Sequence, residues 1–293
     1  MIKVYLDFNI WNYINNDSKY REYFMRKAEK DEWKYFISVA HLEELYKAKR
    51  NEKHDSVGLT DKLENTIREI AEDGVIKPTL DGVKFKYKSY ENTYRDIVNK
   101  DTVDIVYRRS LVRRDRDKNS YDSKDLFQGL EHNKNDEYKK VWDTERVKLE
   151  LEKCNNNYSN ISKELRCPQN KLRKDLIKMY GNTTGEIIIS EFLESAKTQI
   201  CPGIYNQIVD NYGKLEYVME QLYFVLTKCG FKRDNKDKLA NSGTYDIQHS
   251  ICATMCDLFI TNDYGFAEKF KAVAFYLAVP IRIMMLEDIH FDL

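Results

Sequence analysis

Two aspartates follow short apolar segments near opposite ends of the chain. Asp7 comes directly after the run 4–6, and Asp263 follows the run 258–260 after a Thr-Asn pair. Short apolar runs are typical of buried parallel strands, and such sheets bind ligands in the crevice outside the carboxyl ends of the strands. If the two strands are neighbours, carboxylates from distant parts of the chain meet in one cleft.

Two further acids are candidates for the same cleft. The apolar run 36–39 leads into a helical pattern that contains Glu43 and Glu44. Only one of them can face the cleft, because adjacent helical residues point about 100° apart. Asp246 opens another helical pattern, and His249 lies one turn beyond it. His249 is placed to donate a hydrogen bond to Asp246 or to contact a phosphate, unless its role is only structural.

A cluster of carboxylates has a specific chemical implication. Like charges held close together repel one another, so the cluster is costly without a compensating cation. Oxygen ligands without Cys or His partners suit Mg²⁺ or Mn²⁺, which can activate water and stabilise the leaving oxygen of a phosphodiester. The pattern therefore indicates metal-assisted phosphodiester hydrolysis. The alternative is structural, because Asp7 and Asp263 are also placed to cap the helices that follow them.

The composition is that of an ordinary globular protein. The 293 residues include 48 basic and 48 acidic side chains, and 42% of the residues are hydrophobic. The longest uncharged apolar run, 272–281, is too short to span a membrane and contains Pro280. No secretory signal is recognisable and the six cysteines form no zinc-like pattern, so we expect a cytoplasmic protein with reduced thiols and no membrane partner.

The two ends of the chain differ in pattern from its middle. Near both ends, apolar runs alternate with amphipathic helical patterns, which predicts an α/β fold with a parallel, helix-covered sheet. The middle is richer in charged helical patterns, with one small hairpin predicted over 75–85. We therefore predict a discontinuous core formed by residues 1–50 and 186–293, interrupted by a mostly helical insertion over 51–185.

Local basic clusters are the only charge signal for nucleic acid in a chain without net charge. We hypothesise that two of them contact an RNA backbone. Their residues are Arg108, Arg109, Arg113 and Arg114 in the first cluster, and Lys171, Arg173 and Lys174 in the second. The alternative is that these residues only form solvated helix faces.

Four segments together resemble the motifs of PIN-domain nucleases. The run 4–6 followed by Asp7-Phe8-Asn9 is similar to the opening strand of that family. Segment 37–45 resembles the second motif, a Ser-bearing strand leading into a helix with a glutamate, which falls on Glu44 when counted from Ser38. Segment 246–253 resembles the third motif, an Asp opening an alanine-containing helix. Segment 259–266 is close to the fourth, Thr-x-Asp-x-x-Phe, which is the most specific.

The resemblance implies a Rossmann-like α/β/α sandwich and an endoribonuclease that uses one or two Mg²⁺ or Mn²⁺ ions. The implied metal ligands and catalytic residues are Asp7, Glu44, Asp246 and Asp263. The residues expected to orient them are Asn9, Ser38, Thr261 and Asn262, to which our own reading of the sequence adds His249. Water attack would leave a 5′-phosphate and a 3′-hydroxyl. The 202 positions from Glu44 to Asp246 exceed the usual connection by far.

The resemblance also suggests a toxin or phage-defence effector that an inhibitor or defence-system partner holds in check. Two other functions stay open. One is a non-catalytic RNA-binding or assembly module, which the presence of all four acids disfavours. The other is a structure-specific DNA nuclease that uses the same site. The sequence leaves open whether the chain forms a homo-oligomer.

Overall fold

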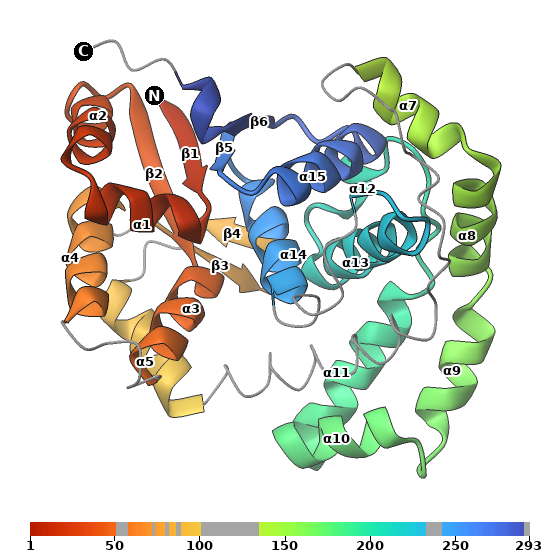
Figure 1. The fold of residues 1–293 in the computed structure, drawn as a ribbon. Helices are drawn as coiled ribbons and strands as arrows, with labels where there is room; N and C mark the ends of the chain where they lie inside the picture. The colour runs from red at the N-terminus through yellow and green to blue at the C-terminus, as the bar shows by residue number, and fades with distance from the viewer. Residues whose placement is uncertain are drawn as a thin grey trace.

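A central parallel sheet organises the chain (Figure 1). The computed structural model describes residues 1–50, 58–71, 74–79, 82–85, 89–100, 135–232 and 242–289. The strands are β1 (Ile2–Leu6), β2 (Trp33–Ser38), β3 (Val75–Thr79), β4 (Gly82–Phe85), β5 (Leu258–Thr261) and β6 (Arg282–Met285). Their order is β4-β3-β2-β1-β5-β6, with every neighbouring pair parallel except β3 and β4. The predicted α/β class is confirmed.

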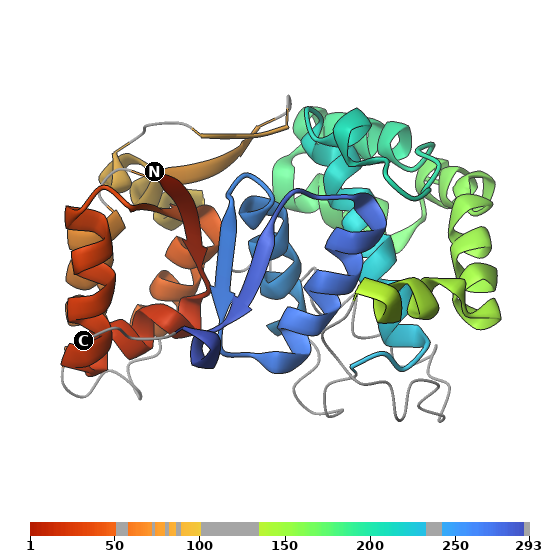
Figure 2. The same cartoon turned by 90° about the horizontal axis from the view of Figure 1, so that it is seen from above.

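Helices cover both faces of this sheet (Figures 1 and 2). On one face lie α1 (Phe8–Asn16), α2 (Ser18–Glu29), α3 (Val39–Arg50), α4 (Leu59–Ala71) and α5 (Tyr90–Lys100). On the other lie α12 (Tyr205–Ile208), α13 (Tyr212–Lys228), α14 (Ser242–Ala253) and α15 (Tyr264–Leu277). Successive strand residues point to opposite faces, so Val4 and Leu6 belong to the first apolar core and Tyr5 to the second.

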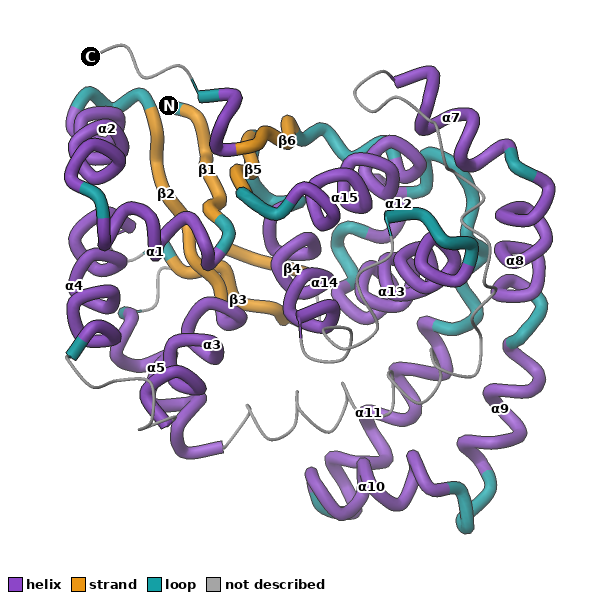
Figure 3. The backbone as a smooth tube through the Cα atoms, in the orientation of Figure 1, coloured by secondary structure: helices purple, strands orange, loops and turns teal. Residues whose placement is uncertain are grey.

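A further layer of helices lies outside the second core (Figure 3). Its members are α7 (Asn135–Asp143), α8 (Glu145–Asn155), α9 (Tyr158–Arg166), α10 (Lys171–Tyr180) and α11 (Asn182–Ser195). Helix α7 is tied to α15, because Trp142 Nε1 donates a hydrogen bond to the Ala272 carbonyl at 2.8 Å. Helices α9–α11 share a separate small apolar cluster of Leu165, Ile189 and Leu193. The 3₁₀ helix η1 (Leu286–Asp288) follows β6.

The segment predicted as a helical insertion is more closely joined to the core than we expected. Its hairpin is confirmed, because β3 and β4 pair antiparallel, and β3 also extends the sheet beside β2. Helix α4 buries Leu63 and Ile67 in the same core as β1. Strand β3 therefore belongs to the same sheet as β1 and β2, although it lies in the segment predicted as the insertion.

No helix in the described ranges is both long and apolar enough to cross a membrane.

Candidate active site at the carboxyl ends of β1 and β5

The carboxyl ends of β1 and β5 meet because the two strands are adjacent, parallel and in register from Val4–Leu258 to Leu6–Ile260. The Thr261 hydroxyl joins the two ends. Its Oγ1 donates a hydrogen bond to Asp7 Oδ2 at 2.7 Å and accepts one from the backbone N–H of Asp263 at 3.0 Å. One hydroxyl therefore contacts both aspartates that the sequence places at strand ends.

Both aspartates also cap helices, as the structural alternative predicted. Asp7 Oδ1 accepts a hydrogen bond from the Phe8 N–H at 2.8 Å at the start of α1. Asp263 Oδ1 accepts one from the Phe266 N–H at 2.8 Å at the start of α15. Capping still leaves these carboxylates able to accept further bonds, because each oxygen has two lone pairs. The structural and chemical interpretations are thus compatible at both positions.

Asp7 is only 5% exposed, whereas Asp263 is exposed. Burial raises the pKa of Asp7, while the nearby His249 and the Thr261 hydroxyl lower it and the charge of Glu44 raises it further. Asp7, Glu44 and His249 therefore act on one another electrostatically, although they come from β1, α3 and α14.

Glu44 and His249 form the second pair of the site. His249 Nε2 lies 2.8 Å from Glu44 Oε2, with the histidine 2% exposed and the glutamate 24% exposed. Burial alone would lower the pKa of His249, but the hydrogen bond and charge of Glu44, together with Asp7, raise it above its ordinary value. The raised pKa favours the charged form of the His249 imidazole beside the carboxylates. The predicted hydrogen bond to Asp246 is corrected, because Nε2 points across to α3 and not back along α14.

A buried hydrogen-bond network lies behind this pair. The Tyr5 hydroxyl is 2.7 Å from His249 Nδ1 and 2.6 Å from Ser38 Oγ. The Ser38 N–H donates to His41 Nδ1 at 3.1 Å, so His41 Nε2 carries the proton that is donated to the Leu6 carbonyl at 2.7 Å. Burial and the neighbouring His249 lower the pKa of His41 well below its ordinary value, which keeps it neutral.

Sequence reasoning missed Tyr5 and His41. A signal was present for each of them. Tyr5 brings a polar atom into a buried strand, where a hydroxyl needs a partner. His41 follows Ser38 by three residues, close enough for a local side chain to backbone bond.

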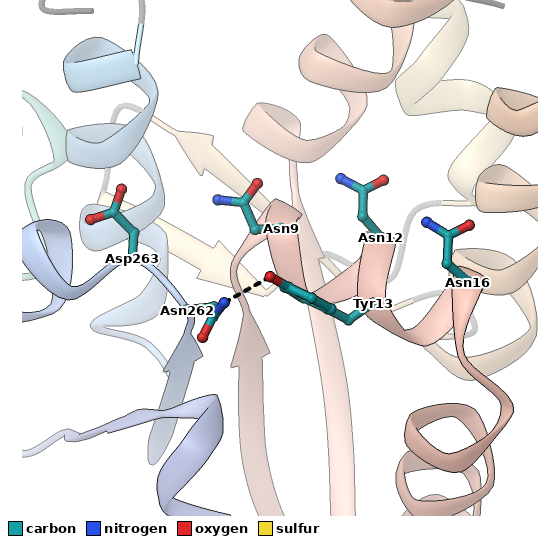
Figure 4. A pocket seen from close by; sticks show the side chains of 6 residues that line it. All are labelled: Asn9, Asn12, Tyr13, Asn16, Asn262 and Asp263. Carbon is teal, nitrogen blue, oxygen red and sulfur yellow. Dashed lines mark hydrogen bonds between the residues drawn. The ribbon is translucent and has the colours of Figure 1, made fainter.

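Asp246, Asn9 and Asn262 lie around this centre. Asp246 is one turn before His249 on α14, and its side chain is partly buried. Asn9 and Asn262 line an open groove of about 340 Å³ together with Asp263. The complete lining is Asn9, Asn12, Tyr13, Asn16, Asn262 and Asp263 (Figure 4).

The donor chemistry of these residues fits a hard divalent cation. In the described part of the chain no Lys or Arg pairs with Asp7, Glu44 or Asp263, and one oxygen of each exposed carboxylate, Glu44 Oε1 and Asp263 Oδ2, makes no hydrogen bond. Carboxylate oxygens are what Mg²⁺ and Mn²⁺ prefer. The described residues nevertheless contain no ready-made cluster of three or more His, Cys, Asp or Glu side chains placed to hold a metal.

The basic residues predicted to contact RNA lie elsewhere. Lys171, Arg173 and Lys174 are on α10, at the lower edge of Figure 1, away from the strand ends. Arg173 forms an ion pair with Glu186 and donates a hydrogen bond to the Leu165 carbonyl at 3.0 Å, so it also joins α10 to its neighbours. The cluster of Arg108, Arg109, Arg113 and Arg114 lies outside the described residues. Contact of either cluster with RNA stays a prediction.

Comparison with protein-family models, with curated proteins and with solved structures finds no match to this chain.

Proposed function

We propose that this protein is a divalent-metal-dependent endoribonuclease with a PIN-like core. The observation that carries the proposal is that the Thr261 hydroxyl binds both the Asp7 carboxylate and the backbone N–H of Asp263, while Glu44 and His249 also act electrostatically on Asp7. This arrangement supports the proposal because it gathers negative charge at the sheet edge where open parallel sheets bind their ligands. The imidazole of His249 lies against these carboxylates, at 2.8 Å from Glu44 Oε2.

Each residue has a distinct role in this proposal. Asp7, Glu44 and Asp263 would hold the metal ion, with Asp246 on α14 as a fourth candidate ligand. Thr261 orients the Asp7 carboxylate, and His249 orients Glu44 while its charge limits the repulsion between carboxylates. When bound, the ion would lower the pKa of a water molecule and stabilise the leaving oxygen of the phosphodiester. The expected products are a 5′-phosphate and a 3′-hydroxyl.

The test compares Asp7→Asn with Asp257→Asn on labelled RNA and DNA in the presence of Mn²⁺, Mg²⁺ or EDTA. Asp257 is the matched control, because it lies at the opposite end of β5, where its carboxylate accepts a hydrogen bond from the Lys3 N–H at 2.8 Å. We expect metal-dependent RNA cleavage by the wild type and D257N, and none by D7N. Cleavage that survives EDTA or the D7N substitution contradicts the mechanism, and cleavage of DNA alone favours the DNA nuclease.

One observation favours a second candidate function, a non-catalytic RNA-binding module. The described residues hold no preassembled cluster of three metal ligands. In that case the wild type and D7N bind RNA equally well and neither cleaves it with any of the metals. The same set of reactions, followed by a binding assay in EDTA, separates the two functions.

A further inference from the structure

The groove beside Asp263 has an unusual lining for a protein with 33% charged residues. Asp263 is the only charged side chain among the described residues that line it, and the others are four asparagines and Tyr13 (Figure 4). Helix α1, which forms most of the wall, carries no acidic or basic residue from Phe8 to Asn16. A lining that contains, within the described part of the chain, one carboxylate and no cation is poorly suited to phosphate and well suited to neutral hydrogen-bonding groups.

The asparagines of α1 form one face of the helix. Asn9, Asn12 and Asn16 are three and four residues apart, about one turn each, while Ile10 and Trp11 are buried against the sheet. The Asn9 and Asn12 side chains make no hydrogen bond within the described part of the chain. Asn favours helix less than Lys, Glu or Ala does, so three of them on one exposed face do not serve helix stability.

Tyr13 is held in position beside these amides. Its hydroxyl accepts a hydrogen bond from Asn262 Nδ2 at 2.8 Å, and its ring meets that of Tyr20 edge-on, with the centroids 5.9 Å apart. The side chain is still 40% exposed. In Figure 4 the ring reaches from α1 toward the β5–α15 connection, below the row of asparagines. A fixed, exposed aromatic ring beside amide groups matches the two contacts that bind an unpaired base, stacking and edge hydrogen bonds.

We infer that this groove is a subsite for one unpaired nucleobase of single-stranded RNA, which it places next to Asp263. The base stacks on Tyr13, and its polar edge pairs with the amides of Asn9, Asn12 and Asn16, each of which offers a donor and an acceptor. A volume of about 340 Å³ lies at the lower end of the range of small-molecule pockets, roughly 300–1,000 Å³. The choice of polymer rests on the proposed function.

The experiment measures binding of fluorescein-labelled RNA dodecamers (homopolymers of A, C and U) by anisotropy in EDTA, so that no cleavage is needed. The variants are N12A/N16A, Tyr13→Leu and Tyr13→Phe, with Asn160→Ala as the control. Alanine is the better helix former, so N12A/N16A keeps α1 folded, and Asn160 is exposed on the distant α9. Y13F keeps the ring that stacks.

We expect N12A/N16A and Y13L each to weaken binding of at least one dodecamer about tenfold, the order of one lost base contact. N160A should bind like the wild type, and Y13F, which keeps the ring but loses the bond to Asn262, should lie between Y13L and the wild type. An abasic dodecamer and an RNA duplex should bind weakly to all the proteins, and with the same affinity to each variant. If N12A/N16A or Y13L weakens the binding of normal and abasic RNA equally, the groove contacts the backbone, and that result overturns the inference.

The inference and the proposed function fail separately. Base-dependent binding that N12A/N16A removes, in a protein without cleavage activity, retains the subsite and removes the nuclease. Metal-dependent cleavage by a protein whose RNA binding is the same in N12A/N16A and wild type retains the nuclease and removes the subsite. Absence of any binding to the dodecamers in EDTA also overturns the inference.

Discussion

The Thr261 hydroxyl shows how single atoms connect the candidate site to the fold. It satisfies a buried carboxylate from β1 and a backbone N–H at the start of α15 at the same time. An unpaired buried carboxylate would be costly, so this bond stabilises the fold while it fixes the direction of Asp7. His249 has the same double function toward Glu44, since it adds a compensating charge to a hydrogen bond.

Loss of the His249 side chain should weaken metal binding. We expect His249→Ala to lower Mn²⁺ affinity about 10- to 100-fold, because a residue that orients a metal ligand typically contributes that much. His249→Gln, which keeps an N–H donor, should retain most of the affinity. Titration calorimetry with Mn²⁺ measures both, and equal affinities for H249A and wild type would contradict the orienting role.

The two neighbouring histidines should have opposite effects on stability as pH changes. The rings of His41 and His249 are 4.6 Å apart, yet the pKa of His41 is lowered and that of His249 is raised. Unfolded His41 binds a proton below about pH 6.5 and folded His41 does not. As the pH is lowered below about 6.5, His41 therefore reduces the unfolding free energy by about 1.4 kcal/mol per pH unit. His249 contributes stability that is present below about pH 6.5 and is lost as pH rises through its raised pKa.

Urea denaturation at about pH 7.5 and about pH 5.5 tests this difference. When the pH is lowered from about 7.5 to about 5.5, the unfolding free energy of His41→Gln should fall by up to about 1.4 kcal/mol less than that of the wild type, because only the pH unit below about 6.5 contributes. The unfolding free energy of H249Q should fall by more than that of the wild type. The same pH dependence in all three proteins would contradict the assignment of a neutral His41 and a charged His249.

At the level of elements, a helix start and a proposed metal ligand coincide at Asp263. The Asp263 carboxylate caps α15 through the Phe266 N–H, three residues on, and the Asp7 carboxylate caps α1 through the N–H of the next residue, Phe8. Parallel strands followed by helices place helix N-termini at the carboxyl edge of the sheet, where the N-terminal dipole stabilises negative charge. The topology therefore selects acidic residues at the site where the proposed chemistry also requires them.

The two roles of Asp263 are separable by substitution. Asp263→Ala should lower the unfolding free energy by about 1 kcal/mol through loss of the cap, whereas Asp263→Asn should keep most of it. Both should abolish cleavage under the proposed function. The control is Asn211→Ala, which removes the cap of α13, where Asn211 Oδ1 accepts from the Lys214 N–H at 2.9 Å. N211A should lose similar stability and retain cleavage, and loss of cleavage there would show that instability alone explains D263A.

Across the whole molecule, the central sheet joins the two ends of the chain. Strand β1 lies between β2 and β5, and the two apolar cores meet across it. Helices α9–α11 form a smaller cluster of their own at the lower edge of Figure 1. A site built across β1 and β5 therefore requires both terminal segments to be folded together.

This arrangement predicts the pattern of amide hydrogen exchange. The amides of β1 and β5 should exchange at the same slow rate, because one cannot open without breaking its pairing with the other. The amides of α9–α11 should exchange faster, since their small apolar cluster supports fewer buried contacts. Mass spectrometry after exchange resolves these peptides. Faster exchange in β5 than in β1 would contradict a single cooperative sheet.

The local patterns of the sequence determine the elements and the positions of the acids along them. Apolar runs with following helical periodicity correctly predicted the strands that end just before Asp7 and shortly before Asp263, and the hairpin over 75–85. These features depend on residues a few positions apart, whose periodicity and capping chemistry operate within one element. The parallel α/β class follows from the same alternation.

Only the tertiary structure decided which of these elements are neighbours. The order of the strands places Thr261 beside Asp7, and the crossing of α3 and α14 pairs His249 with Glu44 in place of Asp246. The groove depends in the same way on Asn262 reaching Tyr13, 249 positions away. Such contacts join residues more than 200 positions apart, and they arise from burying both faces of one sheet, which no local pattern encodes.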